Sequence, residues 1–350
     1  MARIGKVAWR SPSNIALVKY WGKKEVQLPL NPSISMTLTQ CYTETAIEYT
    51  PRDDLKHPTF NLLFQGEKNV FFENKISSFI DVIAKEFSVL NSLHLDINTT
   101  NSFPHSAGIA SSASSLSSLA LCLLYINNKI MGVNMSEADF LRKASFMARL
   151  GSGSACRSVF GSFVLWGETV EIANSSDEYA ISLTSQVDEK FNSYYDAILI
   201  VSSGEKSISS SQGHKLMDFN PYKDNRANVG KSNAINLINA LKNGDEKMFR
   251  DIVEFEAANL HAMFLTSNPS FILIKPETLQ IINKLKQFRD DTNLEFSFTL
   301  DAGPNIHLLY SEDIRHKMLS FIKTELIELC ENGKWIDDKI GIGPILIDSQ

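Results

Sequence analysis

The chain has 350 residues, of which 43% are hydrophobic and 21% are charged. This length can bury a substantial core and suggests two domains. Lys and Arg number 34 against 40 Asp and Glu, which gives a net charge of −6. That balance argues against a nucleic acid as the main partner, because a protein that binds the phosphate backbone needs a basic surface.

The cysteines, the N-terminal residues and the longest apolar stretch bear on the cellular location of the protein. The four cysteines are far apart and include no CxxC pair, so neither a disulfide framework nor a zinc knuckle is expected. The opening MARIGKVAWRSPSN lacks the apolar run of a secretory signal. The longest apolar stretch, LALCLLYI at 119–126, is too short to span a bilayer. We therefore expect a cytoplasmic protein without a membrane partner.

The first part of the chain is predicted to consist mainly of strands. Alternation of apolar and polar residues predicts strands, and apolar residues at helical spacing predict helices. In chain order the pattern predicts a strand with a turn at 11–14, a strand over 35–50, a hairpin over 61–72 turning at Gly66, a helix over 73–90 and a strand over 93–101.

The remainder mixes helices and strands without a regular alternation. The expected elements are helices over 111–127 and 136–150 (the second capped by Ser136 with Asp139), a strand over 195–203, helical patterns over 224–265 and 275–290, a hairpin over 295–311, a helix over 313–331 and the short strand GPILI. This irregular order favours an α+β fold over a doubly wound sheet. We place the domain boundary near residue 190, which gives domains 1–190 and 191–350.

Residues 103–126, FPHSAGIASSASSLSSLALCLLYI, contain many serines at the start of a predicted apolar helix. Serine is a mediocre helix former, so another property is selected there. The first turn of a helix offers free N–H groups and a partial positive charge, and small residues let a phosphate approach them. Serine hydroxyls would add donors or help to hold Mg²⁺. A capped helix whose small residues pack against a neighbouring element explains the spacing equally well.

A second group of small residues, GSGSACRS at 151–158, includes an arginine. Glycines and serines beside Arg157 suit an anion such as a diphosphate or a carboxylate. The alternative is a glycine-rich helix end, which accounts for Gly151 but not for Ser152, Ser154 and Arg157 together.

Lysines and an aspartate follow two apolar strands. NIALVKYWGK at 14–23 contains Lys19 and Lys23, which could pair with phosphate, form a Schiff base or merely lay their stems on apolar surface. In LDAGPN, Asp301 could act as a base, bind magnesium or stabilise a turn. ANVGKS at 227–232 lacks the first glycine of a P-loop, and we interpret it as a chance match.

Together these stretches resemble one family. PSNIALVKYWGK, NPSISMTL, FPHSAGIASSASS, ARLGSGSACRSVFGSFVLW and LDAGPN occur in the order and spacing of the diphosphomevalonate decarboxylases, which belong to the GHMP kinase superfamily. The resemblance covers nearly the whole chain. It implies ATP-dependent decarboxylation of mevalonate 5-diphosphate to isopentenyl diphosphate, with release of ADP, phosphate and CO₂ and with Mg²⁺ as cofactor.

The resemblance also implies a fold and an assembly. The N-terminal domain would be of the ribosomal-protein-S5 type and the C-terminal domain ferredoxin-like, with the active site in the cleft between them. The protein would be a homodimer.

The resemblance assigns a role to each matching residue. It places Asn14, Lys19 and Asp301 at the reaction centre, and Tyr20, Lys23, Ser152, Ser154 and Arg157 on the substrate. It places the ATP phosphates on Pro104, Ser106, Ala107, Gly108, Ser111, Ser112 and Ser115, with Ser111 and Ser112 nearest Mg²⁺. One departure is His105-Ser106-Ala107 where the family usually has Thr-Ala-Ala. An imidazole there would contact a phosphate or change the nucleotide affinity.

Three rival functions remain open at this point. They are decarboxylation of mevalonate 5-phosphate, a GHMP small-molecule kinase that stops at the phosphorylated product, and a nucleotide sensor without catalysis. The presence of both Lys19 and Asp301 argues against the kinase, and these two residues together with Arg157 argue against the sensor.

Overall fold

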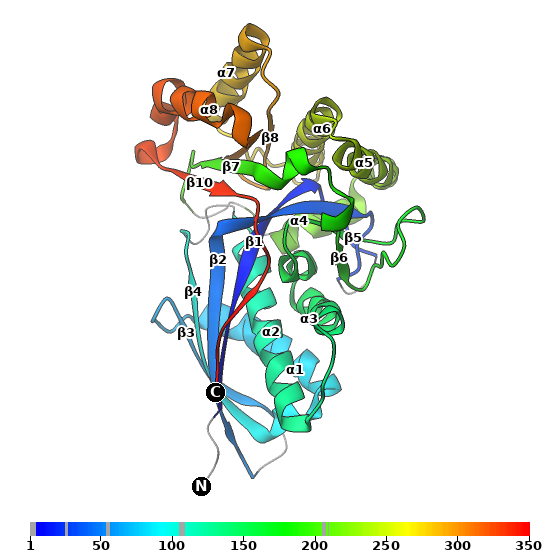
Figure 1. Ribbon diagram of the computed structural model, residues 1–350, viewed down its shortest axis with the longest axis vertical. Helices are drawn as coiled ribbons and strands as arrows, with labels where there is room; N and C mark the ends of the chain where they lie inside the picture. The colour runs from blue at the N-terminus through cyan, green and yellow to red at the C-terminus, as the bar shows by residue number, and fades with distance from the viewer. Residues whose placement is uncertain (1–4, 25–26, 54–56, 105–108, 205–207, 209) are drawn as a thin grey trace.

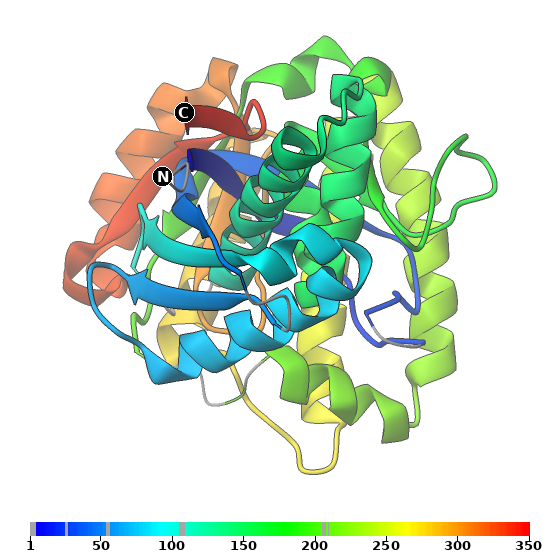
Figure 2. The same ribbon diagram turned by 90° about the horizontal axis from the view of Figure 1, so that it is seen from below.

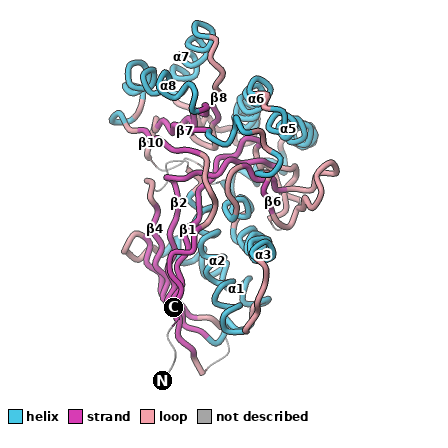
Figure 3. Tube along the Cα trace, viewed as in Figure 1, coloured by secondary structure: helices cyan, strands magenta, loops and turns pink. Residues whose placement is uncertain are grey.

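Two β-sheets and the helices packed on them organise the chain, which confirms the predicted α+β class (Figures 1 and 3). The computed structural model describes residues 5–24, 27–53, 57–104, 109–204, 208 and 210–350. None of the helices in these ranges is long and apolar enough to cross a membrane.

The first sheet has seven strands in the described ranges, with the central order β11-β1-β2-β4-β3 and with β5 and β6 added beside β2. Neighbours run antiparallel except β3 and β4, which are parallel. Its strands are β1 (Gly5–Val18), β2 (Ser33–Pro51), β3 (Thr59–Phe64), β4 (Leu93–Asn101), β5 (Phe163–Trp166), β6 (Ala180–Ser182) and β11 (Ile345–Ser349).

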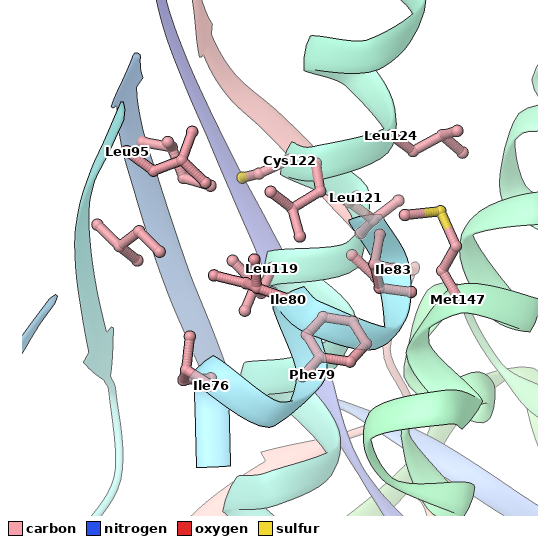
Figure 4. Packing of buried hydrophobic residues seen from close by; sticks show 14 of the residues in the cluster. Ile76, Phe79, Ile80, Ile83, Leu95, Leu119, Leu121, Cys122, Leu124 and Met147 are labelled. Carbon is pink, nitrogen blue, oxygen red and sulfur yellow. The ribbon is translucent and has the colours of Figure 1, made fainter. Parts of the chain in front are cut away.

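Three helices, α1 (Val70–Glu86), α2 (Ser111–Met131) and α3 (Glu137–Gly151), bury their apolar faces with this sheet. Figure 4 shows Ile76, Ile80 and Leu119 near Leu95 of the sheet. Residues of β4 alternate between this core and the other, more exposed face, as expected for a sheet covered on one side. The view from below in Figure 2 shows these helices grouped beside the strands.

The second sheet is four-stranded, with the order β10-β7-β9-β8 and antiparallel pairing throughout. Its strands are β7 (Tyr194–Leu199), β8 (Ser297–Thr299), β9 (Ile306–Ser311) and β10 (Trp335–Lys339). The helices of this half are α4 (Ser210–Leu216), α5 (Lys223–Asn243), α6 (Glu246–Leu265), α7 (Pro276–Thr292) and α8 (Arg315–Phe321).

A shared core joins the two sheets. It contains buried side chains of β1, β2 and β5 together with others from β7, α5 and α6. The Asp338 carboxylate of β10 adds a polar link, because it accepts hydrogen bonds from three successive N–H groups, those of Thr39, Gln40 and Cys41, at 2.9, 2.7 and 2.7 Å. The last strand, β11, returns to pair with β1. Residues far apart in the sequence can therefore meet in one site.

One sequence prediction of local structure was wrong, and two were confirmed only in part. The turn at 11–14 is a continuous part of β1 with a register shift between Pro12 and Asn14. The hairpin over 61–72 holds only for its turn at Gly66, where Phe64 and Glu67 form one antiparallel bridge; β3 pairs in parallel with β4, and α1 begins at Val70 in place of a second strand. Asn69 caps that helix by accepting from the Phe72 N–H at 3.0 Å, a signal that the strand-like residues around it obscured. The helix over 313–331 holds in its extent, since the chain is helical over 312–329, but it changes from 3₁₀ to α (α8), then to π and back to 3₁₀.

Other predictions were confirmed. Strands lie at 33–51, 93–101 and 345–349, and β8 and β9 form the hairpin around DAGPN. Ser136 caps α3, since its Oγ accepts from the Asp139 N–H at 3.1 Å. ANVGKS lies inside α5, where a phosphate loop cannot form, so it is a chance match.

The inner serines of α2 serve the packing of this helix on the sheet. Their hydroxyls hydrogen-bond to hydroxyl side chains of β1 and β2, in the pairs Ser11–Ser117 (2.6 Å), Thr43–Ser114 (2.7 Å) and Thr45–Ser118 (2.7 Å). All six side chains are buried or nearly so. Small polar residues here let the helix approach the strands while every buried hydroxyl keeps a partner. Packing therefore accounts for these three serines.

We predict that Ser117→Leu destabilises the protein by about 1–3 kcal/mol or more, because an extra side chain overpacks the interface and Ser11 loses a partner. Chemical denaturation followed by circular dichroism measures this change. The matched control is Ser78→Leu on the exposed side of α1, which should stay within about 0.5 kcal/mol of the wild type. Equal stabilities of the two variants would show that the interface tolerates bulk.

Candidate active site

A lysine that follows β1 and an aspartate that follows β8 meet where the two sheets join. Lys19 Nζ lies 2.9 Å from Asp301 Oδ1 and also donates to the Ala16 carbonyl oxygen at 2.6 Å. The Lys19 side chain is 2% exposed and that of Asp301 is 28% exposed. Asp301 is thus the member of the pair that a ligand can reach, and Lys19 supports it from behind.

Burial and charge act in opposite directions on this lysine. Burial lowers the pKa of Lys19, whereas the charge and the hydrogen bond of Asp301 raise it again. An ammonium beside a carboxylate favours the ionised form of both groups. The geometry therefore suits an aspartate that stays ionised and can accept a proton.

Asn14 and Arg157 lie next to this pair. Arg157, in the 3₁₀ helix Gly153–Val159, donates to Ser33 Oγ at 2.6 Å and approaches Asn14 Oδ1 at 3.5 Å. Asn14 in turn donates to Ser158 Oγ at 2.8 Å. The Arg157 Nε is buried and has no hydrogen-bond partner among the residues that the structure describes. Burial lowers the pKa of Arg157, because the charged guanidinium has lost water, and a bound anion would offset this effect.

Tyr20 packs beside Arg157 in a space that a glycine keeps open. A Cβ at Gly153 would lie 2.8 Å from Tyr20 Oη and 2.7 Å from the Trp166 ring, so only glycine fits there. The Tyr20 hydroxyl is buried, and within the described ranges no group hydrogen-bonds to it. Arg157 lies close enough to Tyr20 to affect its ionisation. Arg157 Nε and the Tyr20 hydroxyl are both donors that suit an anionic ligand.

His214 of α4 is a neighbour that sequence reasoning missed. Its Nδ1 accepts from the Gly22 N–H at 3.1 Å, and its ring packs on those of Tyr20 and Trp21. Burial lowers the pKa of His214 to about 3, and the cations Lys23 and Arg157 add to this effect. His214 is therefore neutral near pH 7, with its proton on Nε2.

The other predicted substrate residues lie at the more open side. Lys23 is half-buried and donates to Gln27 Oε1 at 2.7 Å. Burial lowers the pKa of Lys23, and the nearby Lys215 contributes in the same direction. Ser152 and Ser154 are partly exposed, with their hydroxyls 3.5 Å apart. These groups can offer donors to a ligand that also touches Asp301.

The predicted phosphate site lies at the start of α2, and the structure describes only part of it. His105, Ser106, Ala107 and Gly108 lie outside the described residues. Pro104 is described and exposed. Within the described ranges no side chain caps α2, and Ala110 before it adopts a left-handed backbone with φ +36°. The start of α2 thus lacks a side-chain cap from the described residues, which is compatible with an anion as the cap.

The three predicted serines of this site differ in their surroundings. Ser111 Oγ accepts from Asn101 at 2.8 Å, and Ser112 Oγ accepts from Lys75 Nζ at 2.9 Å. Ser115 is 2% exposed and donates to the Ser111 carbonyl oxygen at 2.6 Å. Ser111 and Ser112 are thus the hydroxyls nearest the helix start, and Ser115 is engaged inside the helix.

Lys75 of α1 is a second residue that sequence reasoning missed. Burial and, to a smaller extent, the positive charge of Lys23 lower the pKa of Lys75 to about 8. Lys75 therefore links two parts of the site. It hydrogen-bonds to Ser112 at the start of α2, and it lies close enough to Lys23, a predicted substrate residue, for their charges to interact. No motif marks it, since it lies in a predicted amphipathic helix.

No group of three or more His, Cys, Asp or Glu side chains in the described part of the chain could hold a metal ion. Mg²⁺ usually keeps several waters and binds through substrate phosphates with one or two protein oxygens. The hydroxyls of Ser111 and Ser112 fit that arrangement, in which the metal arrives with a nucleotide.

Comparison with known proteins supports one family over the whole chain. The model for the diphosphomevalonate decarboxylase-like N-terminal domain matches residues 11–180, and that for the mevalonate 5-diphosphate decarboxylase C-terminal domain matches residues 197–339. The diphosphomevalonate decarboxylase of Saccharomyces cerevisiae is 29% identical over 329 residues, which are 89% of this chain and 79% of that protein.

Solved structures agree with the sequence matches. That of mevalonate diphosphate decarboxylase from Staphylococcus aureus is 27% identical, covers 99% of both chains and has a TM-score of 0.83. A solved complex with MVAPP, AMPPCP and magnesium is also 27% identical, with a TM-score of 0.81 over 99% of this chain and 100% of the other. The two domain models and the full-length likeness show that this chain belongs to the diphosphomevalonate decarboxylase family.

Proposed function

We propose that this protein catalyses the ATP-dependent decarboxylation of mevalonate 5-diphosphate to isopentenyl diphosphate, with release of ADP, phosphate and CO₂. The observation that carries the proposal is the 2.9 Å contact between buried Lys19 and the accessible Asp301. It places an ionised carboxylate beside a set of cationic groups, as this reaction needs. Family membership and the relative solved with MVAPP, AMPPCP and magnesium support the same substrates.

The substrate's two anionic ends match the donors around Asp301. We assign the diphosphate and the carboxylate to Tyr20, Lys23, Ser152, Ser154 and Arg157, the groups that lie between the 3₁₀ helix and the end of β1. Burial lowers the pKa of both Arg157 and Lys23, and a bound anion offsets that cost. The pairing is strongest where water is excluded, at Arg157.

Asp301 acts on the tertiary C3 hydroxyl, which is a poor nucleophile and a worse leaving group. Its carboxylate orients this hydroxyl and takes its proton while the oxygen forms a bond to the γ-phosphorus of ATP and the bond to ADP breaks. Lys19 keeps the Asp301 carboxylate ionised in the free enzyme. Asn14, next to Arg157, completes the reaction centre.

The second step needs no electron sink from a cofactor. The phosphorylated C3 oxygen leaves as phosphate with its bonding pair, the carboxylate carbon leaves as CO₂, and the electrons of that C–C bond form the alkene. Positive charge develops at C3 as the phosphate departs, and Asp301 stabilises this stage as a carboxylate once it has passed its proton to the leaving phosphate.

The nucleotide is assigned to the start of α2. The ATP phosphates would face the first N–H groups of this helix, with Lys75 and Ser112 beside them. Mg²⁺, when bound near Ser111 and Ser112, supplies charge that offsets the developing negative charge on the transferred phosphoryl group. Among the predicted ATP residues, Ser106, Ala107 and Gly108 stay predictions, as does the effect of His105.

Finer features of the fold and the assembly are also proposals. A boundary near 190 is supported by the matched segments, which end at 180 and begin at 197. The four-stranded antiparallel second sheet supports a ferredoxin-like C-terminal domain, and we assign the ribosomal-protein-S5 type to the N-terminal one. The ion pair between residues of the two halves supports an active site in the cleft between them. The homodimer and the cytoplasmic location stay predictions from family resemblance and sequence.

The first prediction of the proposed function concerns the products. With mevalonate 5-diphosphate and ATP, the protein should release ADP and CO₂ in equal amounts. Asp301→Asn should lower the rate by about a hundredfold or more, because the base is lost while the side chain keeps its shape. A coupled assay for ADP, run alongside trapping of CO₂, measures both products.

The same assay separates the rivals. ADP without CO₂ would identify a kinase that stops at the phosphorylated product. Faster turnover of mevalonate 5-phosphate would assign the smaller substrate. No substrate-dependent ADP from either compound would leave a nucleotide sensor and contradict the proposed function.

The second prediction concerns the pH dependence of ATP binding. The pKa of Lys75 is about 8 in the free protein, and a bound anion should raise it. ATP binding near that pH should therefore take up a proton at Lys75, and the affinity should fall as the pH rises through about 8. Titration calorimetry in two buffers that differ in ionisation enthalpy measures the uptake.

The matched control for this experiment is Lys85→Met, at an exposed position of the same helix. Lys75→Met should remove the proton uptake and the pH dependence, whereas Lys85→Met should keep both. Equal uptake by wild type and Lys75→Met would exclude Lys75 from the nucleotide site.

A further inference from the structure

We propose that the buried pair Arg226–Glu256 positions Lys19 for the reaction by holding both polar groups of its main chain. This inference rests on the proposed function, since it assigns a role toward the same reaction centre. Neither side chain touches the substrate groups named above, so both are positioning residues.

The contacts form a closed network around the main chain of one residue, Lys19. The Lys19 N–H donates to Glu256 Oε2 at 2.9 Å, and Arg226 Nη2 donates to the Lys19 carbonyl oxygen at 3.1 Å. The same guanidinium binds Glu256 through two hydrogen bonds, at 2.6 and 3.1 Å. Arg226 is 1% exposed and Glu256 is fully buried. The charged side chains of Arg226 and Glu256 thus hold the main chain of Lys19, whose ammonium pairs with Asp301.

Neighbouring residues complete the network and leave it little freedom. Asn31 also donates to the Lys19 carbonyl oxygen, at 3.1 Å, and Asn233 donates to Glu256 Oε1 at 2.7 Å. Gly230 of α5 makes room for these groups, because a Cβ there would lie 2.7 Å from Asn31 Nδ2 and 3.0 Å from Arg226 Nη1. A glycine inside a helix costs stability, and here the cost is explained by the close approach.

Lys19 needs such a hold because the sheet does not provide one. β1 ends at Val18, so the Lys19 N–H and carbonyl find their partners in α5 and α6 and not in a strand ladder. Helix α6 also packs against β8, the strand that leads to Asp301, and its His261 hydrogen-bonds to the Asp301 backbone. One helix therefore places both members of the Lys19–Asp301 pair, although they come from different sheets.

A purely structural role explains the pair less well. A buried ion pair is often no more stabilising than apolar residues of the same size, because both charges must leave water. Catalysis gives a reason to keep it, since a shift of about 1 Å in a reacting group can cost a hundredfold in rate. Two hydrogen bonds to the main chain fix the starting point of the Lys19 side chain.

The charges around Lys19 affect the pH profile of kcat, which a change in packing alone would not shift. The groups that face its ammonium are Asp301, Glu256, Arg157 and His261. After burial, which lowers the pKa of Lys19, Asp301 and then Glu256 raise it, and Arg157 lowers it. Loss of the Glu256 charge should therefore lower the pKa of Lys19 further. The alkaline limb of the kcat profile should then move to lower pH.

The test compares two neighbouring glutamates of α6. Glu256→Gln keeps the size of the side chain and removes its charge. The matched control is Glu254→Gln, whose carboxylate pairs with Arg289 of α7 and does not touch Lys19. In steady-state assays of CO₂ release, Glu256→Gln should lose about tenfold or more in kcat with KM changed less than about threefold. Its alkaline limb should shift as stated, and Glu254→Gln should match the wild type in both.

A second variant keeps the proposal testable if Glu256→Gln does not fold. Arg226→Lys retains the charge beside Glu256 but cannot bridge both the carboxylate and the Lys19 carbonyl. It should also lower kcat more than it changes KM. Thermal unfolding of each variant shows which ones are folded at the assay temperature.

The outcomes separate this inference from the proposed function. A wild type that releases no CO₂ contradicts the function itself. An active wild type with a Glu256→Gln or Arg226→Lys variant of unchanged kcat and pH profile overturns the positioning role alone. An equal loss of kcat in Glu254→Gln would show general damage to α6 and would also overturn it.

Discussion

The salt bridge between Lys19 and Asp301 is the interaction on which the site depends, because each residue is supplied by a different half of the chain. The end of β1 delivers the lysine, and the turn after β8 delivers the aspartate. The pair can form only if the core between the two sheets fixes their relative position. The pair is therefore complete only when both halves are folded and packed together.

Burial of cations is the physical cost of this arrangement. Burial lowers the pKa of Lys19, Arg157, Lys23 and Lys75, all in one connected region. These buried cations lie among a few hydrogen-bond donors and can interact with anions. A substrate and a nucleotide that together carry several negative charges offset this cost when they bind. A site built in this way would bind anionic ligands mainly through charge.

Sequence reasoning could propose the residues that lie in motifs, but it gave no signal for those that join them through the fold. Asn14, Lys19, Tyr20, Arg157 and Asp301 lie beside small or turn-forming residues, and the structure brings them together. Arg226, Glu256, His214 and Lys75 lie in helices, where spacing marks only the buried face. The residues of the site that they contact, Lys19, Gly22 and Ser112, are more than 30 residues away in sequence, so no local pattern could reveal them. The α2 serines show the same limit, since phosphate binding and helix packing require the same small polar residues.

The central claim is that Lys19 and Asp301 act as one unit, and a double-mutant cycle on CO₂ release tests it most directly. The rate would be measured for wild type, Lys19→Met, Asp301→Asn and the double variant. If each residue works through the other, the double variant should be about as slow as the slower single variant. If the two losses in kcat multiply instead, the residues act independently, and the salt bridge is not the unit that performs the reaction.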